Sequence, residues 1–175
     1  MNTESFREDI SFAKIASELK KMVVIDQDMR ERNQMDSTVD ARHTERMKEI
    51  VDEIGWPTIS KVGKDASHKA WVLVQHADHD LPFQQLCLSL MKEASISEVN
   101  VENIVYLEDR LRVSMGQKQL YGTQFYQDNN QHIPEPIEDE VNVNTRRALV
   151  GMGPLQDQID MMYRECPFDS DSPES

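Results

Sequence analysis

The stretch Trp71-Val72-Leu73-Val74-Gln75-His76-Ala77-Asp78-His79-Asp80 joins an apolar run directly to two histidines and two aspartates. The apolar spacing from about Asp65 to His79 predicts a helix that is apolar on nearly every side, and such a helix is covered by several neighbours. If the helix continues, His76, His79 and Asp80 share one side of it. Polar groups are costly to bury unless they are paired, so this patch predicts a structural partner or a chemical role.

Other helices are expected on both sides of this central one. Apolar residues recur every three or four positions at about residues 5–32, 39–54, 83–94 and 101–115. Gly55 and Pro57 are typical of a helix end, and Asp80 and Pro82 are typical of a helix start. The chain up to Met115 is therefore predicted to be helical.

The pattern changes after Gly116. Residues 120–126 favour a strand, residues 127–130 favour a turn, and residues 132–137 could return as an edge strand. Two short helices are expected after this hairpin, one ending near Val150 and one ending near Arg164. The prediction is a mainly α, compact single domain over residues 1–164, with about five to seven helices and a small β-hairpin. Residues 165–175 are acidic and rich in Ser and Pro, which predicts a disordered tail.

Composition narrows the classes of partner. The 175 residues carry 32 acidic and 19 basic side chains, and this net charge of -13 opposes binding to nucleic acid or to anionic lipid. No apolar run approaches the length of a membrane span, and residues 1–5 lack the pattern of a signal peptide. The two cysteines form no disulfide framework and no zinc pattern. We therefore expect a cytoplasmic protein.

A metal site is one interpretation of the His/Asp stretch, since imidazole and carboxylate groups bind zinc, iron and manganese. His79-Asp80 also occurs as a pair in metal phosphohydrolases, but these proteins need further ligands in a recognisable order. His43, Glu108 and His132 are possible ligands, yet nothing in their spacing selects them. The sequence therefore favours a site with no metal and no cofactor.

In the metal-free interpretation, His76 is a general acid/base, and Asp78 or Glu108 orients its ring. Arg112 or Arg146 would bind an anionic group with its planar fork. Trp56 would shape the mouth of the pocket, and neutral hydrogen bonds would come from Gln119, Tyr121, Thr123 and Gln124. The structural interpretation is that the histidines and aspartates bond the backbone or cap helices, and that Trp56 fills the core.

Asp26 and Arg30 continue the apolar stripe of the first predicted helix. At this spacing they form an intrahelical ion pair, or they project with Gln27 into a pocket. The sequence leaves both interpretations open.

Several segments together resemble a known family. They are Gly55-Trp56-Pro57-Thr58, Val74-Gln75-His76-Ala77-Asp78, Leu107-Glu108-Asp109-Arg110 and Gln119-Leu120-Tyr121-Gly122-Thr123-Gln124. This pattern, which spans about Asp26 to Leu155, is similar to that of an uncharacterised, mainly bacterial domain-of-unknown-function family. The resemblance implies that the segments belong to one ancestral domain, and that Gln75 and Arg110 join the other polar residues if they converge. It implies no activity.

Two functions follow from these residues. The leading one is a cytoplasmic enzyme of hydrolytic or group-transfer type acting on a small polar or anionic substrate, with Arg110, Arg112 or Arg146 binding the anion. The alternative is a non-catalytic module that binds a small molecule or a protein. In that case the polar segments are structural, and the acidic surface meets a basic partner.

Overall fold

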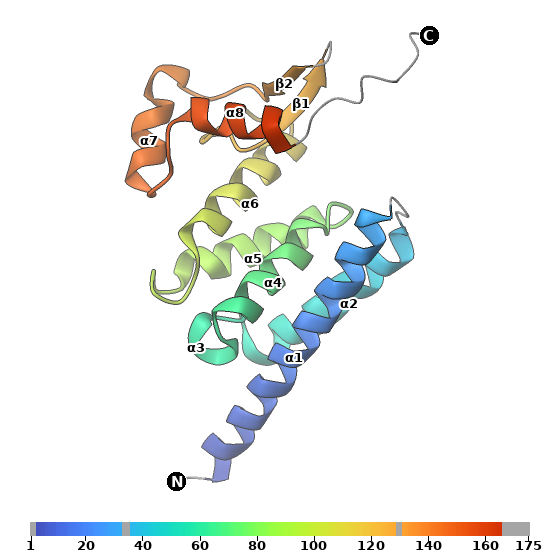
Figure 1. Cartoon of the computed structure of the whole chain (residues 1–175). Coiled ribbons are helices and arrows are strands. Elements are labelled where there is room, and N and C mark those ends of the chain that lie inside the picture. The colour runs from blue at the N-terminus through green and yellow to red at the C-terminus, as the bar shows by residue number, and fades with distance from the viewer. Residues whose placement is uncertain (1–2, 33–35, 129–130, 166–175) are drawn as a thin grey trace. The chain divides into compact units, whose positions relative to one another are not determined.

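A computed structural model describes residues 3–32, 36–128 and 131–165, and these residues are mainly helical with one β-hairpin, as predicted (Figure 1). The contacts within the chain divide it into two units, Met1–Leu107 and Glu108–Ser175. The described residues form eight α-helices, one more than expected. The additional one is the single turn α3 (Ile59–Val62), in a segment predicted as a loop.

The first unit is built around α4 (Lys64–Gln75). This helix packs against α1 (Thr3–Glu31), α2 (Ser37–Ile54), α3 and α5 (Leu81–Glu93). Ala66, Ala70, Leu73 and Val74 of α4 are buried, as expected for a helix covered on several sides. The prediction of a central helix is confirmed. The helix α6 (Val101–Ser114) crosses the boundary between the two units.

The central helix ends at Gln75, earlier than the sequence predicted. Gln84 of α5 is fully buried, and its amide donates to the carbonyl oxygens of Val74 (3.0 Å) and Gln75 (3.2 Å). These bonds occupy carbonyl groups that a longer α4 would need for its own next turn. His76 is therefore the C-cap residue, and residues 76–80 form the turn into α5. The predicted helical side shared by His76, His79 and Asp80 is wrong.

Asp80 caps α5, as expected from its position before Pro82. Its carboxylate accepts a hydrogen bond from the Phe83 backbone amide at 3.1 Å. Lys48 of α2 forms an ion pair with Asp80 at 2.8 Å.

The second unit contains the hairpin of β1 (Phe125–Asp128) and β2 (Gln131–Pro134). A 3-10 turn (Glu140–Asn142), α7 (Val143–Leu149) and α8 (Leu155–Glu165) follow it. The α8 helix packs on β2, where the rings of His132 and Tyr163 meet at 5.7 Å between centroids. The first strand begins five residues later than predicted, since the amides of Leu120, Tyr121 and Thr123 are turned toward Asp109 instead. The tip of the predicted turn at residues 129–130 and the predicted disordered tail at residues 166–175 lie outside the described residues.

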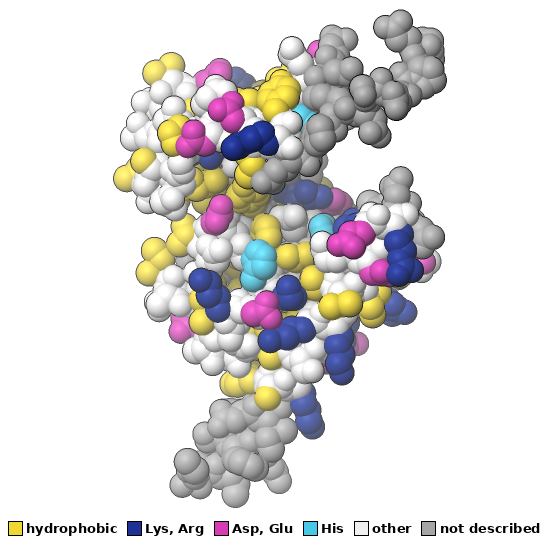
Figure 2. All heavy atoms as spheres, viewed as in Figure 1, with side chains coloured by type: hydrophobic (Ala, Val, Ile, Leu, Met, Phe, Trp, Pro, Cys, Tyr) yellow, Lys and Arg dark blue, Asp and Glu magenta, His cyan; other side chains and the backbone are white. Residues whose placement is uncertain are grey.

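The visible face in Figure 2 mixes basic and acidic side chains. Ion pairs of the described residues include Lys20 with Asp65 (3.0 Å) and Arg46 with Glu18 (2.6 Å). Within the described part of the chain, no helix has the length and apolar character that crossing a bilayer requires.

Gly122 is closely packed in the second unit. Its φ is +74°, and a Cβ atom there would lie 2.5 Å from Cδ1 of Leu155. Gly122→Ala is expected to lower the free energy of unfolding by about 1.5 kcal/mol, since both the backbone conformation and the contact become unfavourable. Urea unfolding measures the change.

Gly151→Ala is the matched control for this prediction. Gly151 has a φ of +79°, but among the described residues nothing lies within 4 Å of its added Cβ. Its substitution should cost only the backbone strain, about 1 kcal/mol. Equal losses in the two variants would show that the contact with Leu155 has no effect.

Candidate functional site

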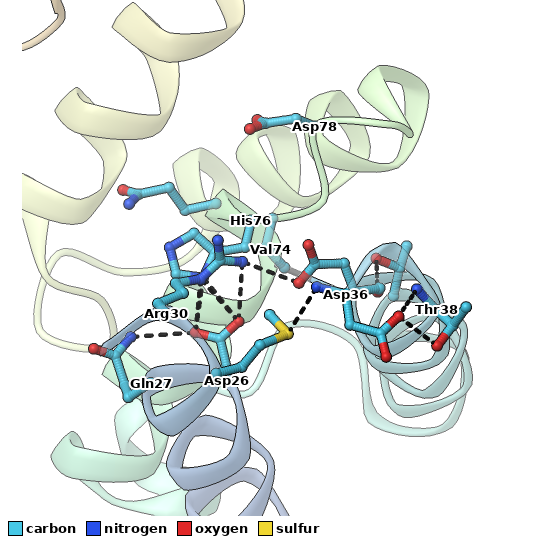
Figure 3. A network of polar contacts seen from close by, with 12 residues as sticks. Asp26, Gln27, Arg30, Asp36, Thr38, Val74, His76 and Asp78 are labelled. Atoms are coloured by element: carbon cyan, nitrogen blue, oxygen red, sulfur yellow. Dashed lines mark hydrogen bonds and ion pairs between the residues drawn. The ribbon is translucent and has the colours of Figure 1, made fainter. Parts of the chain in front are cut away.

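A buried Asp–His contact joins two helices of the first unit (Figure 3). Nδ1 of His76, at the end of α4, lies 2.9 Å from Oδ2 of Asp26 on α1. The Asp26 side chain is 1% exposed, whereas that of His76 is 16% exposed. One ring nitrogen therefore meets a buried carboxylate while part of the ring reaches solvent. Within the described residues, Nε2 of His76 has no hydrogen-bond partner.

Arg30 completes this cluster one helical turn after Asp26. Its Nη2 donates to Oδ1 of Asp26 at 3.1 Å and to Oδ1 of Asp40 on α2 at 2.9 Å. Its Nε–H is directed at both Asp26 oxygens (3.3 Å each) and at Nδ1 of His76 (3.1 Å). A carboxylate can only accept, and Nδ1 lies nearer to Oδ2 of Asp26 (2.9 Å) than to Nε of Arg30 (3.1 Å). We therefore assign the proton to Nδ1, which donates it to Asp26, and the Nε hydrogen of Arg30 to the Asp26 oxygens. Gln27 adds a further donor to Asp26 at 3.2 Å.

Asp26 stays ionised despite its burial. Burial raises the pKa of this carboxyl, but the hydrogen bonds and charges of His76 and Arg30 outweigh that effect and lower the pKa to about 2. The carboxylate is therefore a fixed negative charge at working pH, and it can hold the His76 ring in one tautomer.

His43 is a second histidine beside the cluster. It lies on α2, one turn after Asp40, and is 5% exposed. Its Nδ1 is buried and has no partner among the described residues. Burial lowers the pKa of His43, and the charge of Asp26 acts in the opposite direction. His43 is therefore a neutral side chain at neutral pH.

Three further predicted residues of the first unit lie near the ends of α2 and α4. Asp78 accepts a hydrogen bond from the Gln84 amide at 3.3 Å, and Figure 3 shows its carboxylate apart from the Asp26–His76 contact. Gln75, the last residue of α4, is half-buried. Trp56 is 4% exposed, and its Nε1 has no partner in the part of the chain described. The carboxylate that bonds His76 is thus that of Asp26, from α1.

In the second unit, polar residues gather around Asp109. This α6 residue is fully buried, and its carboxylate accepts bonds from the backbone amides of Leu120 (2.7 Å), Tyr121 (3.1 Å) and Thr123 (3.1 Å). The Thr123 hydroxyl donates a fourth bond at 3.0 Å. Burial raises the pKa of Asp109, although the amide donors act in the opposite direction. Asp109 holds the loop that precedes β1.

Gln119 and Gln124 form further hydrogen bonds in the same loop. The Gln119 side chain is fully buried, and its amide donates to the carbonyl oxygens of Gln124 (2.9 Å) and Glu135 (2.8 Å). Its Oε1 accepts the Gln124 backbone amide at 2.9 Å. The Gln124 side chain donates to the Thr123 hydroxyl at 3.1 Å. These side chains are bonded to their own loop.

The predicted anion-binding arginines also bond the backbone of the second unit. Arg112 donates to the carbonyl oxygen of Lys118 at 2.7 Å and pairs with Glu138. Arg146 donates to the carbonyl oxygens of Leu120 (2.9 Å) and Asp139 (3.0 Å). Each guanidinium thus ties two parts of the chain together.

Glu108, Arg110 and Tyr121 are half-buried. Burial raises the pKa of the Tyr121 phenol, and the charges of Glu108 and Asp109 raise it further. Glu108, Arg110 and Tyr121 belong to the second unit, whereas His76 belongs to the first. The convergence of all the predicted polar residues in one pocket stays a prediction.

The sequence interpretation missed Asp26 as the partner of His76 and Asp109 as the centre of the second unit. Asp26 carried a signal, because it lies on the apolar stripe of its helix, where a charge needs a partner. The structure has the intrahelical ion pair of Asp26 and Arg30 and adds His76 to it, and the interpretation that these side chains project into a pocket stays a prediction. Among the described residues, no three His, Cys, Asp or Glu side chains are grouped so that they could hold a metal ion.

The fold and this cluster define the class of protein: it is mainly helical, and it has an Asp–His–Arg cluster between its helices. The chain belongs to DUF6624, a family of unknown function whose family model matches residues 17–166. The resemblance to an uncharacterised domain is thereby confirmed. No curated protein and no solved structure matches the chain.

Proposed function

We propose that this protein is an enzyme of hydrolytic or group-transfer type in which His76 is the general acid/base. One observation carries the proposal: His76 Nδ1 is 2.9 Å from the buried carboxylate of Asp26, and its ring is partly exposed. A histidine held in this way by a carboxylate is the arrangement that proton-transfer catalysis needs.

The chemistry follows from the tautomer. When Nδ1–H donates a hydrogen bond to the ionised carboxylate of Asp26, Nε2 carries the free electron pair. Nε2 can then take a proton from water or from a hydroxyl group as that group attacks the substrate. The ring then becomes a cation, which the Asp26 charge stabilises. With neutral His76, the charges of Asp26, Arg30 and Asp40 sum to -1, so uptake of a proton makes the cluster neutral.

The substrate in this proposal is a small polar or anionic molecule. Asp78 and Glu108 remain candidates for further catalytic groups. The candidates for substrate contacts are Trp56, Gln75, Arg110, Arg112, Gln119, Tyr121, Thr123, Gln124 and Arg146. Gln119 and Arg146 bond the backbone here, so in this proposal they shape the pocket rather than move with the substrate.

His76→Gln tests the proposal. Removal of a general acid/base is expected to lower kcat/KM at least 100-fold, because proton transfer by a positioned side chain contributes about 10²–10⁴-fold. The measurement uses purified protein and a panel of chromogenic carboxylic and phosphate esters. His79→Gln, which removes an exposed histidine three residues later, is the matched control and should leave the rate unchanged.

A rate that His76→Gln leaves within twofold of the unsubstituted protein would contradict the proposal. Equal losses in the His76 and His79 variants would also contradict it. Melting temperatures of both variants separate a loss of chemistry from a loss of folded protein.

The second candidate is a non-catalytic module that binds a small molecule or a protein. The observation in its favour is that Asp109, Gln119 and Arg146 bond the chain's own backbone. In that case His76→Gln would lower the melting temperature and have no effect specific to any ligand in a metabolite screen.

The proposal also covers the location and the source of the protein. We infer a cytoplasmic location and, from the family resemblance, a bacterial source. The net charge of -13 supports a partner other than nucleic acid or an anionic membrane.

A further inference from the structure

We propose that Asp40 is a positioning residue for His76 and acts on it through Arg30. This inference rests on the proposed role of His76 as general acid/base. It adds a third helix to the site, because Asp26 and Arg30 lie on α1, His76 caps α4 and Asp40 lies on α2.

The geometry places Arg30 between two carboxylates. One nitrogen, Nη2, donates to both Asp26 (3.1 Å) and Asp40 (2.9 Å), and each bond uses one of its two hydrogens. Both hydrogens of this nitrogen are bonded to carboxylates. The planar guanidinium therefore cannot rotate without breaking one of these charge-assisted hydrogen bonds. Asp40, together with Asp26, therefore fixes the orientation of the guanidinium. The same Asp26 carboxylate accepts the bond from Nδ1 of His76 at 2.9 Å, so Asp40 acts on His76 through Arg30 and Asp26.

The position of Asp40 on α2 favours its ion pair with Arg30. It lies in the first turn of α2, where unpaired backbone amides favour a negative charge. Its side chain is 20% exposed and that of Arg30 is 22% exposed, so water only partly screens their ion pair. The Thr44 hydroxyl donates to the Asp40 carbonyl oxygen at 2.9 Å, which holds the backbone of this turn.

The charge of Asp40 also balances that of Arg30. Without Asp40, the guanidinium would present a larger uncompensated positive field to His76, and protonation of the ring would become less favourable. His43 of α2 interacts electrostatically with Asp26, Asp40 and Arg30, and Arg42 of the same helix acts on His43. Neither forms a hydrogen bond to Asp26 or His76 in the described structure.

Asp40→Asn tests the inference by NMR titration of the His76 ring in the full chain. Loss of one negative charge should lower the pH midpoint of ring protonation by about 0.5 to 1 unit. Asp40→Glu keeps the charge and should restore the midpoint to within about 0.2 unit. A residue that only stabilised the fold would leave the midpoint of the folded protein unchanged.

Glu45→Gln is the matched control, since it removes a negative charge from the same helix at a residue that pairs with Lys48 instead. The inference is overturned if Asp40→Asn shifts the midpoint no more than Glu45→Gln does. It is also overturned if Asp40→Glu fails to restore the midpoint.

A second measurement needs no substitution, so it serves if Asp40→Asn does not fold. The hydrogens on Nη2 of Arg30 should give separate, slowly exchanging NMR signals in the native protein, because both are bonded to carboxylates. A single averaged signal would refute the role of Asp40. Neither experiment requires catalytic activity, so a failure here is distinct from a failure of the proposed function, which the kinetics of His76→Gln decide.

Discussion

Asp109→Asn is expected to lower the free energy of unfolding of the Glu108–Ser175 unit by about 3 kcal/mol. The carboxylate of Asp109 accepts three backbone amides and one hydroxyl, and it is fully buried. An asparagine keeps the shape but replaces one acceptor oxygen with an NH₂ group. Whichever way the asparagine side chain is turned, its NH₂ group would face hydrogen-bond donors of the loop. At least one backbone amide therefore loses its acceptor.

Amide hydrogen exchange measures this loss of stability at the backbone amides that Asp109 binds. Protection of the amides of Leu120, Tyr121 and Thr123 should fall about 100-fold, which corresponds to nearly 3 kcal/mol. Glu102→Gln makes the same chemical change at an exposed position of the same helix, and it should change stability by less than about 0.5 kcal/mol. Unchanged protection at these three amides in Asp109→Asn would refute the view that Asp109 holds the loop.

Asp26→Asn is expected to lower the free energy of unfolding at neutral pH by about 2 to 3 kcal/mol. The pKa of Asp26 is about 2 in the folded protein against an ordinary value of 3.8. A carboxyl whose pKa falls on folding stabilises the fold above its unfolded pKa, and this contribution is lost as pH falls through the folded pKa. The contribution of Asp26 is therefore complete above about pH 4 and disappears between about pH 4 and pH 2.

The measurement is urea unfolding of both proteins from pH 7 to pH 2. The difference in stability between the unsubstituted protein and Asp26→Asn should shrink steadily below pH 4. Asp52→Asn, at an exposed position on α2, serves as the control and should show no such convergence. A difference that stayed constant down to pH 2 would show that Asp26 does not stabilise the fold through its charge.

Both predictions concern residues that the sequence placed on helices without naming their partners. Periodicity put Asp26 on the apolar stripe of the first helix and predicted the helix that carries Asp109. The sequence could not show that Asp26 would meet His76, fifty residues later. The His/Asp stretch contains His76, but its own aspartates have other partners. Asp80 caps α5, and Asp78 accepts a bond from Gln84.

The sequence alone determined the described helices other than the single turn α3, the presence of the hairpin and several helix ends, because these depend on residues within one or two turns of each other. The tertiary structure decided where α4 ends, since the buried amide of Gln84 bonds the carbonyl oxygens of Val74 and Gln75. It also decided which carboxylate holds His76 and which one holds the loop before β1. A buried charge takes its partner from whichever helix packs against it, and that choice is made only when the helices come together.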